Sequence, residues 1–160
     1  MNDRVPDKLR AFRPDAVLST KEFRGDLAIG IRAEDLVAVC QFLKNDPGLG
    51  YTMAIDITAV DYYRPEDRYE IVYHLYSPMR KTYLRLKVSV DERDLTVPSV
   101  TGVWRAADWH ERETFDMFGI KFSGHPDLRR LYMPEEFEYH PLRKDFPLMG
   151  IPDSIPLPRR

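Results

Sequence analysis

The alternation of hydrophobic and polar residues predicts β-strands through the first two thirds of the chain. Short apolar runs occupy residues 17–23 and 27–31, and apolar residues recur at every second position in residues 27–31, 53–59, 69–75 and 84–90. This period is that of a strand with one buried face. The first two runs flank Arg24, Gly25 and Asp26, which favour a hairpin. The last three runs are joined by short connections, which predict antiparallel neighbours.

Helical spacing lies between and after these runs. Residues 34–44 place their apolar side chains on one side, and an Asp-Pro-Gly sequence ends them at Asp46. A shorter helix is predicted at residues 7–12. A third should lead to Gly119, where a left-handed cap suits glycine, with Ser99 as the capping residue at its start. The order α-β-β-α-β-β-β-α predicts an α+β, two-layer fold, with an antiparallel-dominated sheet and helices on one face.

The third helix carries a carboxylate in the middle of its apolar face. On a helical wheel Glu111 lies among Trp104, Ala107, Thr114, Phe115 and Phe118, while Arg105, Arg112, Glu113 and Asp116 lie on the opposite side. Burying an unpaired carboxylate costs several kcal/mol. We therefore expect Glu111 to be buried and bound by an arginine from the segment that follows, with Arg129 or Arg130 as first candidates.

The composition changes near residue 125. Seven of the thirteen prolines lie in the last 35 residues, and proline is incompatible with a long helix or a central strand. The same segment is too apolar for a solvated linker. We interpret residues 1–124 as an α+β domain and residues 125–160 as an extended, proline-rich docking tail. Residues 148–160 should become ordered only against a partner.

Composition and charge exclude several functions. The chain has 160 residues, long enough for one domain with a core, and a net charge of −2, which argues against nucleic acid as the main partner. No apolar run approaches the length of a membrane span and no signal core precedes the domain, so we expect a soluble, cytoplasmic protein. The single cysteine, Cys40, cannot hold an iron–sulfur cluster and is expected to be buried.

Three sets of residues could carry chemistry, and each also has a structural interpretation. Glu111, Glu113 and Asp116 could be acid/base groups, but a structural ion network with nearby arginines is favoured. His125 and His140 could bind metal, but an imidazole bonded to backbone in a His-Pro turn is favoured, because no second ligand stands three or four residues away on a shared helix. The basic residues could bind phosphate, but no glycine-rich loop accompanies them. The basic residues are Arg129, Arg130, Arg143 and Lys144.

The segments ERETFDMFG, GHPDLRR and HPLRKDFP occur in this order between residues 111 and 147. Together they closely resemble the signature of the 30 kDa subunit of respiratory complex I, known in bacteria as the C subunit. The resemblance marks sixteen structural or interface residues: Glu111, Arg112, Glu113, Asp116, Gly119, His125, Pro126, Leu128, Arg129, Arg130, His140, Pro141, Leu142, Arg143, Lys144 and Asp145.

The resemblance implies a non-catalytic subunit in the peripheral arm of NADH:quinone oxidoreductase, with no catalytic, cofactor-binding or metal residue of its own. FMN, iron–sulfur clusters and quinone would belong to partner subunits. The expected partners are the subunit related to hydrogenase large chains and the subunit that holds the terminal cluster, on the cytoplasmic face of the membrane. One alternative is the same type of subunit in a membrane-bound hydrogenase or in a dehydrogenase with another electron donor. Another is a free-standing hydrolase using Glu113 or Asp116.

Overall fold

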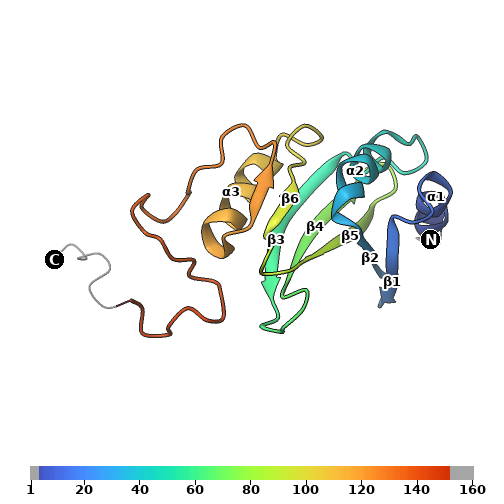
Figure 1. Ribbon diagram of the computed structural model, residues 1–160. Coiled ribbons are helices and arrows are strands. Elements are labelled where there is room, and N and C mark those ends of the chain that lie inside the picture. The colour runs from blue at the N-terminus through green and yellow to red at the C-terminus, as the bar shows by residue number, and fades with distance from the viewer. Residues whose placement is uncertain (1–3, 152–160) are drawn as a thin grey trace.

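The computed structural model describes residues 4–151 and contains a five-stranded sheet with strand order β1-β2-β5-β4-β3 (Figure 1). The strands are β1 Val17–Phe23, β2 Asp26–Ile31, β3 Met53–Asp61, β4 Tyr69–Ser77 and β5 Thr82–Val90. All five predicted strands are therefore present. The predicted hairpin joins β1 to β2, with Arg24 and Gly25 at φ angles of 52° and 86°.

The pairing of the strands is mostly antiparallel, as expected. β3 pairs with β4 and β4 with β5 in antiparallel register, whereas β2 and β5 run parallel. The parallel pair arises because α2, Leu36–Asn45, and the β3–β4 hairpin intervene in the chain between β2 and β5. β5 thus joins the N-terminal hairpin to the rest of the sheet.

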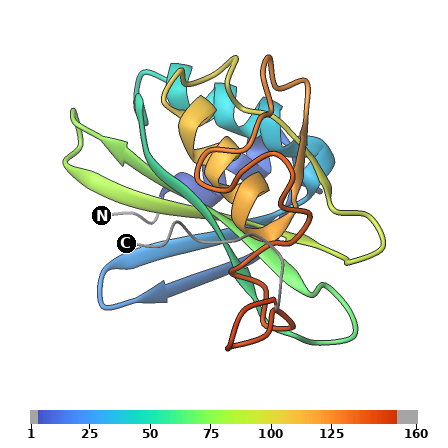
Figure 2. The same ribbon diagram turned by 90° about the vertical axis from the view of Figure 1, so that its left-hand side faces the viewer.

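The helices α2 and α3, Ala107–Phe118, cover one face of the sheet, which confirms the α+β prediction (Figure 2). Their apolar sides and the inward-facing strand residues form one core, in which Tyr51, Tyr69 and Tyr73 are among the largest buried side chains. Cys40 is buried in the same core on α2, as expected.

The boundaries of the first and third helices differ from the prediction. α1 spans Arg4–Phe12 and so begins three residues earlier, because Val5, Pro6 and Leu9 are buried against the core. The residue before α3 is Ala106, with no side-chain cap, so the prediction that Ser99 caps this helix is wrong. Ser99 instead follows a short strand, β6 Thr96–Pro98, which pairs in parallel with β7 Lys121–Ser123. At its other end α3 stops at Gly119, which has the expected left-handed conformation (φ 78°).

Residues 125–151, which we call the arm, contain no helix or strand and lie across α3 (Figure 2). Leu128 and Met133 pack against the core of the domain. Leu148 and Met149 are fully or almost fully exposed. The prediction that residues 148–160 need a partner to become ordered concerns mostly residues 152–160, which lie outside the described part of the chain.

Candidate functional site

Asp116 on α3 is the main attachment point of the arm. Its side chain is inaccessible to solvent (0% exposed). Its Oδ2 accepts hydrogen bonds from three successive backbone N–H groups, those of Leu131 (3.0 Å), Tyr132 (2.7 Å) and Met133 (2.9 Å). Oδ1 accepts a hydrogen bond from Arg130 Nη1 at 2.7 Å. One carboxylate therefore fixes four consecutive residues of an irregular segment. We call this arrangement the Asp116 clasp.

The clasp favours the charged form of Asp116. Burial alone would raise the pKa of this carboxyl, but the three N–H donors and Arg130 outweigh it, so the pKa lies below the ordinary value. Arg130 is itself mostly buried, and its Nη1 also lies 3.2 Å from the carbonyl oxygen of Tyr139, which links two turns of the arm. Charge-assisted bonds of this kind are stronger than neutral ones.

A second attachment point joins the arm to the sheet and was not found by sequence reasoning. Arg68 binds both carboxylate oxygens of Asp61, at 3.0 and 2.8 Å, and pairs with Glu92 at 2.7 Å and with Asp145 of the arm at 3.0 Å. Asp61 also accepts the backbone N–H of Lys144 at 2.8 Å. Burial alone would raise the pKa of Asp61, but the bonds from Arg68 and Lys144 lower it to about 2.

His140 and Arg143 hold the arm against the C-terminal end of α3. His140 Nδ1 lies 2.9 Å from the carbonyl oxygen of Asp116, and Arg143 Nε donates to the carbonyl oxygen of Phe118 at 2.7 Å. Both groups meet the last carbonyls of a helix, which have no partner within the helix. Gly119 makes room for them, because a Cβ at this position would lie 2.5 Å from Arg143 Nη2 and 2.6 Å from His140 Nε2.

The next contact along the arm is a backbone one. The N–H of Leu142 donates to the carbonyl oxygen of Met117 at 3.1 Å, although the Leu142 side chain stays exposed. Pro141, which precedes it, is half-buried. With His140 and Arg143, this bond satisfies three consecutive carbonyls of the last turn of α3.

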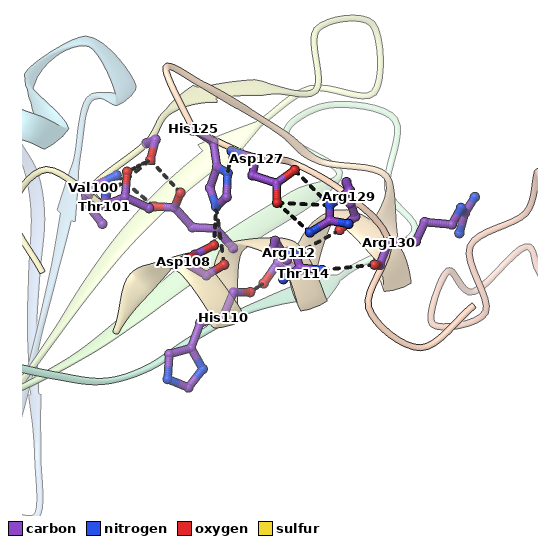
Figure 3. A network of polar contacts seen from close by, with 12 residues as sticks. Val100, Thr101, Asp108, His110, Arg112, Thr114, His125, Asp127, Arg129 and Arg130 are labelled. Atoms are coloured by element: carbon purple, nitrogen blue, oxygen red, sulfur yellow. Dashed lines mark hydrogen bonds and ion pairs between the residues drawn. The ribbon is translucent and has the colours of Figure 1, made fainter. Parts of the chain in front are cut away.

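The first His-Pro turn is attached at the other end of α3 (Figure 3). The buried imidazole of His125 lies between Asp108 and Asp127: its Nδ1 accepts the N–H of Asp127 at 3.0 Å, and its Nε2 lies 3.3 Å from the carbonyl oxygen of Asp108. Its neighbour Pro126 is exposed. Both histidines thus bond to backbone, as the structural interpretation predicted.

Arg112 extends this contact along the helix. Its guanidinium stacks on Trp109, 5.0 Å from the ring centroid, and donates to the carbonyl oxygens of Arg129 and Arg130 at 3.2 and 3.3 Å. Arg129 itself turns outward and pairs with Asp127 at 2.7 Å on the surface. Arg129, Arg130 and Arg143 are therefore engaged by the chain's own groups.

Glu111 is buried as expected (0% exposed), but the prediction of an arginine partner is wrong. Its Oε1 accepts the N–H of Val100 at 2.7 Å and its Oε2 accepts the Ser99 hydroxyl at 2.6 Å. Both donors are neutral and come from the turn after β6. Burial is therefore the larger influence and raises the pKa of Glu111 to about 7. The arginine expected here binds Asp116 instead, because the arm crosses the opposite side of the helix.

Glu113 does not join either arrangement: within residues 4–151 no hydrogen bond or ion pair of this half-buried side chain is found. The expected ion network of three carboxylates is therefore reduced to Asp116 as its one arginine-bound member. The same part of the chain contains no group of three or more His, Cys, Asp or Glu side chains that could hold a metal ion. None of its helices is both long and apolar enough to span a bilayer.

Comparison with known proteins extends this picture. A family model described as "Respiratory-chain NADH dehydrogenase, 30 Kd subunit" matches residues 29–152. The NADH-quinone oxidoreductase C subunit of Roseiflexus sp. (strain RS-1) is 52% identical over 147 residues, covering 92% of this chain and 84% of the relative. The C subunit of Geotalea uraniireducens (strain Rf4) is 46% identical over 155 residues, covering 97% and 93%.

Two solved structures share the fold. The trypsin-resistant fragment (1-134) of Nqo5 has a TM-score of 0.64 and 30% identity, covering 78% of this chain and 99% of the fragment. A chain of the membrane-bound sulfane sulfur reductase, an archaeal respiratory membrane complex, has a TM-score of 0.74 and 25% identity, covering 92% of this chain and 86% of that one.

The α+β domain, its attached arm and these relatives define the class of protein: a subunit of the respiratory complex I type. More particularly, the chain belongs to the family of the 30 kDa subunit of the respiratory-chain NADH dehydrogenase, whose bacterial members above are C subunits of NADH-quinone oxidoreductase.

Proposed function

We propose that this chain is a non-catalytic subunit in the peripheral arm of an NADH:quinone oxidoreductase, where it supports the quinone-reducing module. The observation that carries the proposal is the 52% identity to a bacterial C subunit across 92% of the chain. In such an enzyme electrons pass from NADH through FMN and iron–sulfur clusters to quinone, coupled to proton translocation. These cofactors would belong to partner subunits, since one buried cysteine cannot supply cluster ligands.

The chemistry of the arm supports a scaffolding role over a catalytic one. Asp116, Arg130, His140 and Arg143 are all engaged in holding the arm to α3. Asp116 is therefore not free to transfer a proton to a substrate, which disfavours it, though not Glu113, as the acid/base group of the hydrolase alternative. The arm meanwhile exposes large apolar side chains, which favour burial against another protein. They are Tyr132, Tyr139, Leu142, Leu148 and Met149.

The proposed partners are the subunit related to hydrogenase large chains and the subunit that holds the terminal cluster, on the cytoplasmic face of the membrane. Native purification of a tagged chain from solubilised membranes tests this. We expect those two subunits and bound flavin to be recovered with the tagged chain and not with a tagged unrelated cytoplasmic protein. Recovery of the chain alone would contradict the proposal.

A second candidate is the same type of subunit in another membrane-bound oxidoreductase, such as a hydrogenase or a dehydrogenase with a different electron donor. This candidate is supported by the structural similarity, over 92% of the present chain, to a subunit of the sulfane sulfur reductase. The same purification separates the two, because the second candidate predicts an assembly with nickel-iron or without an NADH-oxidising flavin subunit.

A further inference from the structure

The strand β1 forms an open edge of the sheet. It is the outermost strand and lies beside β2 (Figure 1). Six of its seven residues are exposed. No other strand among residues 4–151 pairs with it. An uncovered edge presents backbone N–H and C=O groups to which a further strand can add.

The register identifies which groups face outward. Arg24 and Gly25 both have positive φ, so they form a two-residue type I′ turn that closes Phe23 and Asp26 as a hydrogen-bonded pair. Hydrogen-bonded and non-hydrogen-bonded pairs alternate along an antiparallel ladder. Lys21 is then bonded to β2, whereas Thr20 and Glu22 direct their backbone groups to the outer edge.

The opposite edge of the sheet is covered by the chain itself. α3 lies along β3, and the Thr114 hydroxyl is 3.0 Å from the carbonyl oxygen of Ile57. Apart from its pairing with β2, the main contact of β1 within the described residues is with α1, where Arg10 Nη2 lies 3.4 Å from the Thr20 hydroxyl. The fold therefore shields one edge and leaves the other open.

The side chains of β1 indicate the chemistry of a matching strand. Lys21 and Glu22 point to opposite faces of the sheet, and neither has an ion pair with any residue from 4 to 151. Leu18 and Phe23 are 63% and 62% exposed at the two ends of the strand. A strand with an acidic residue beside Lys21, a basic residue beside Glu22 and apolar residues at its ends would satisfy all four.

We propose that β1 accepts an extended strand of another subunit, which adds to its outer edge and lengthens the sheet. The proposal rests on the proposed function in taking that strand from a subunit of the same complex. The backbone supplies the attraction, and the opposite charges of Lys21 and Glu22 select the partner and its register.

Amide hydrogen exchange resolved to single residues tests the addition, measured on the full chain alone and in the purified complex. The amides of Thr20 and Glu22 should exchange at least about 100-fold more slowly in the complex, while those of Lys21 and Phe23 are slow in both states. Equal exchange of Thr20 and Glu22 in the two states would overturn the proposal. Failure to recover any complex would instead contradict the proposed function on which it rests.

A proline variant gives a second test. Thr20→Pro removes an outward N–H without removing a bond to β2, whereas the matched Thr20→Val keeps the N–H. If the Thr20→Pro chain has the wild-type circular dichroism spectrum, its recovery in the complex should fall by about tenfold and that of Thr20→Val should not. Wild-type recovery of a folded Thr20→Pro chain would refute strand addition. If Thr20→Pro does not fold, the exchange experiment, which uses no substitution, decides.

Discussion

Replacing Asp116 by asparagine should detach the arm from α3. The amide keeps one acceptor oxygen but turns an NH2 group toward either Arg130 or the backbone N–H groups of residues 131–133, so donor meets donor. The charge that compensates the mostly buried Arg130 is lost as well. Removing one partner of a buried ion pair costs about 3–5 kcal/mol, and we expect a loss of stability in that range.

The measurement is urea unfolding of the purified chain, followed by circular dichroism and by tryptophan fluorescence, which comes from Trp104 in the core and from Trp109 under Arg112 beside the arm. Exchange of the amides of Leu131, Tyr132 and Met133 reports on the clasp directly. In Asp116→Asn these three amides should lose protection even where the sheet amides keep theirs, because the arm can open without unfolding the domain.

Asp127→Asn is the matched control. Asp127 also pairs with an arginine of the arm, but at the surface, where such pairs contribute little. The control should leave the unfolding midpoint nearly unchanged. Our account of the clasp is refuted if Asp116→Asn unfolds within about 0.5 kcal/mol of the wild type, the spread typical of neutral surface substitutions, and keeps residues 131–133 protected.

Three further predictions concern single side chains. The pKa of Glu111 is raised to about 7 in the folded chain, so the folded state binds more protons than the unfolded state between the unfolded pKa of about 4.3 and pH 7. Wild-type stability should therefore fall as the pH rises toward 7, and Glu111→Gln, which does not titrate, should gain stability relative to the wild type over this range in urea titrations. A stability difference between the two chains that stays constant with pH would contradict the burial argument. Gly119→Ala should lower the melting temperature more than Gly25→Ala. Both variants force alanine into a left-handed backbone, which costs about 1–2 kcal/mol, but only at Gly119 would the new Cβ also meet His140 and Arg143. Equal losses of melting temperature would refute the packing of these two side chains against Gly119. Burial, and secondarily the charge of Glu111, raises the pKa of the Cys40 thiol. A thiol reagent should therefore label Cys40 only in urea. Rapid labelling of the native chain would show that α2 is not packed as described.

The sequence predicted the elements that have a regular period. β2, β3, β4, β5 and α2 follow from alternation and helical spacing, and β1 from its short apolar run before the predicted turn at Arg24, Gly25 and Asp26. β6 and β7 have three residues each, too few for a period to be seen. Their pairing depends on contacts between residues about 25 positions apart, such as Thr96 with Lys121.

The candidate site was predicted in its residues but not in all of its contacts. A helical wheel correctly placed Glu111 on the buried face, yet it cannot show which loop supplies the donors, and these are Ser99 and Val100. Asp116 was assigned to the outer face because the wheel does not show an irregular segment that covers that face. The second attachment point, at Asp61, was missed because it joins residues 83 positions apart, and no local pattern reports such a contact.

The central claim is that this chain supports electron transfer by assembly and carries no redox group itself. The decisive measurement is the visible absorbance and NADH oxidation of the full chain alone, beside the complex recovered with the tagged chain. We predict no absorbance and no activity for the chain alone, and flavin absorbance with NADH:quinone activity for the complex. Stoichiometric iron or flavin retained by the lone chain, or an inactive complex without flavin, would contradict the claim.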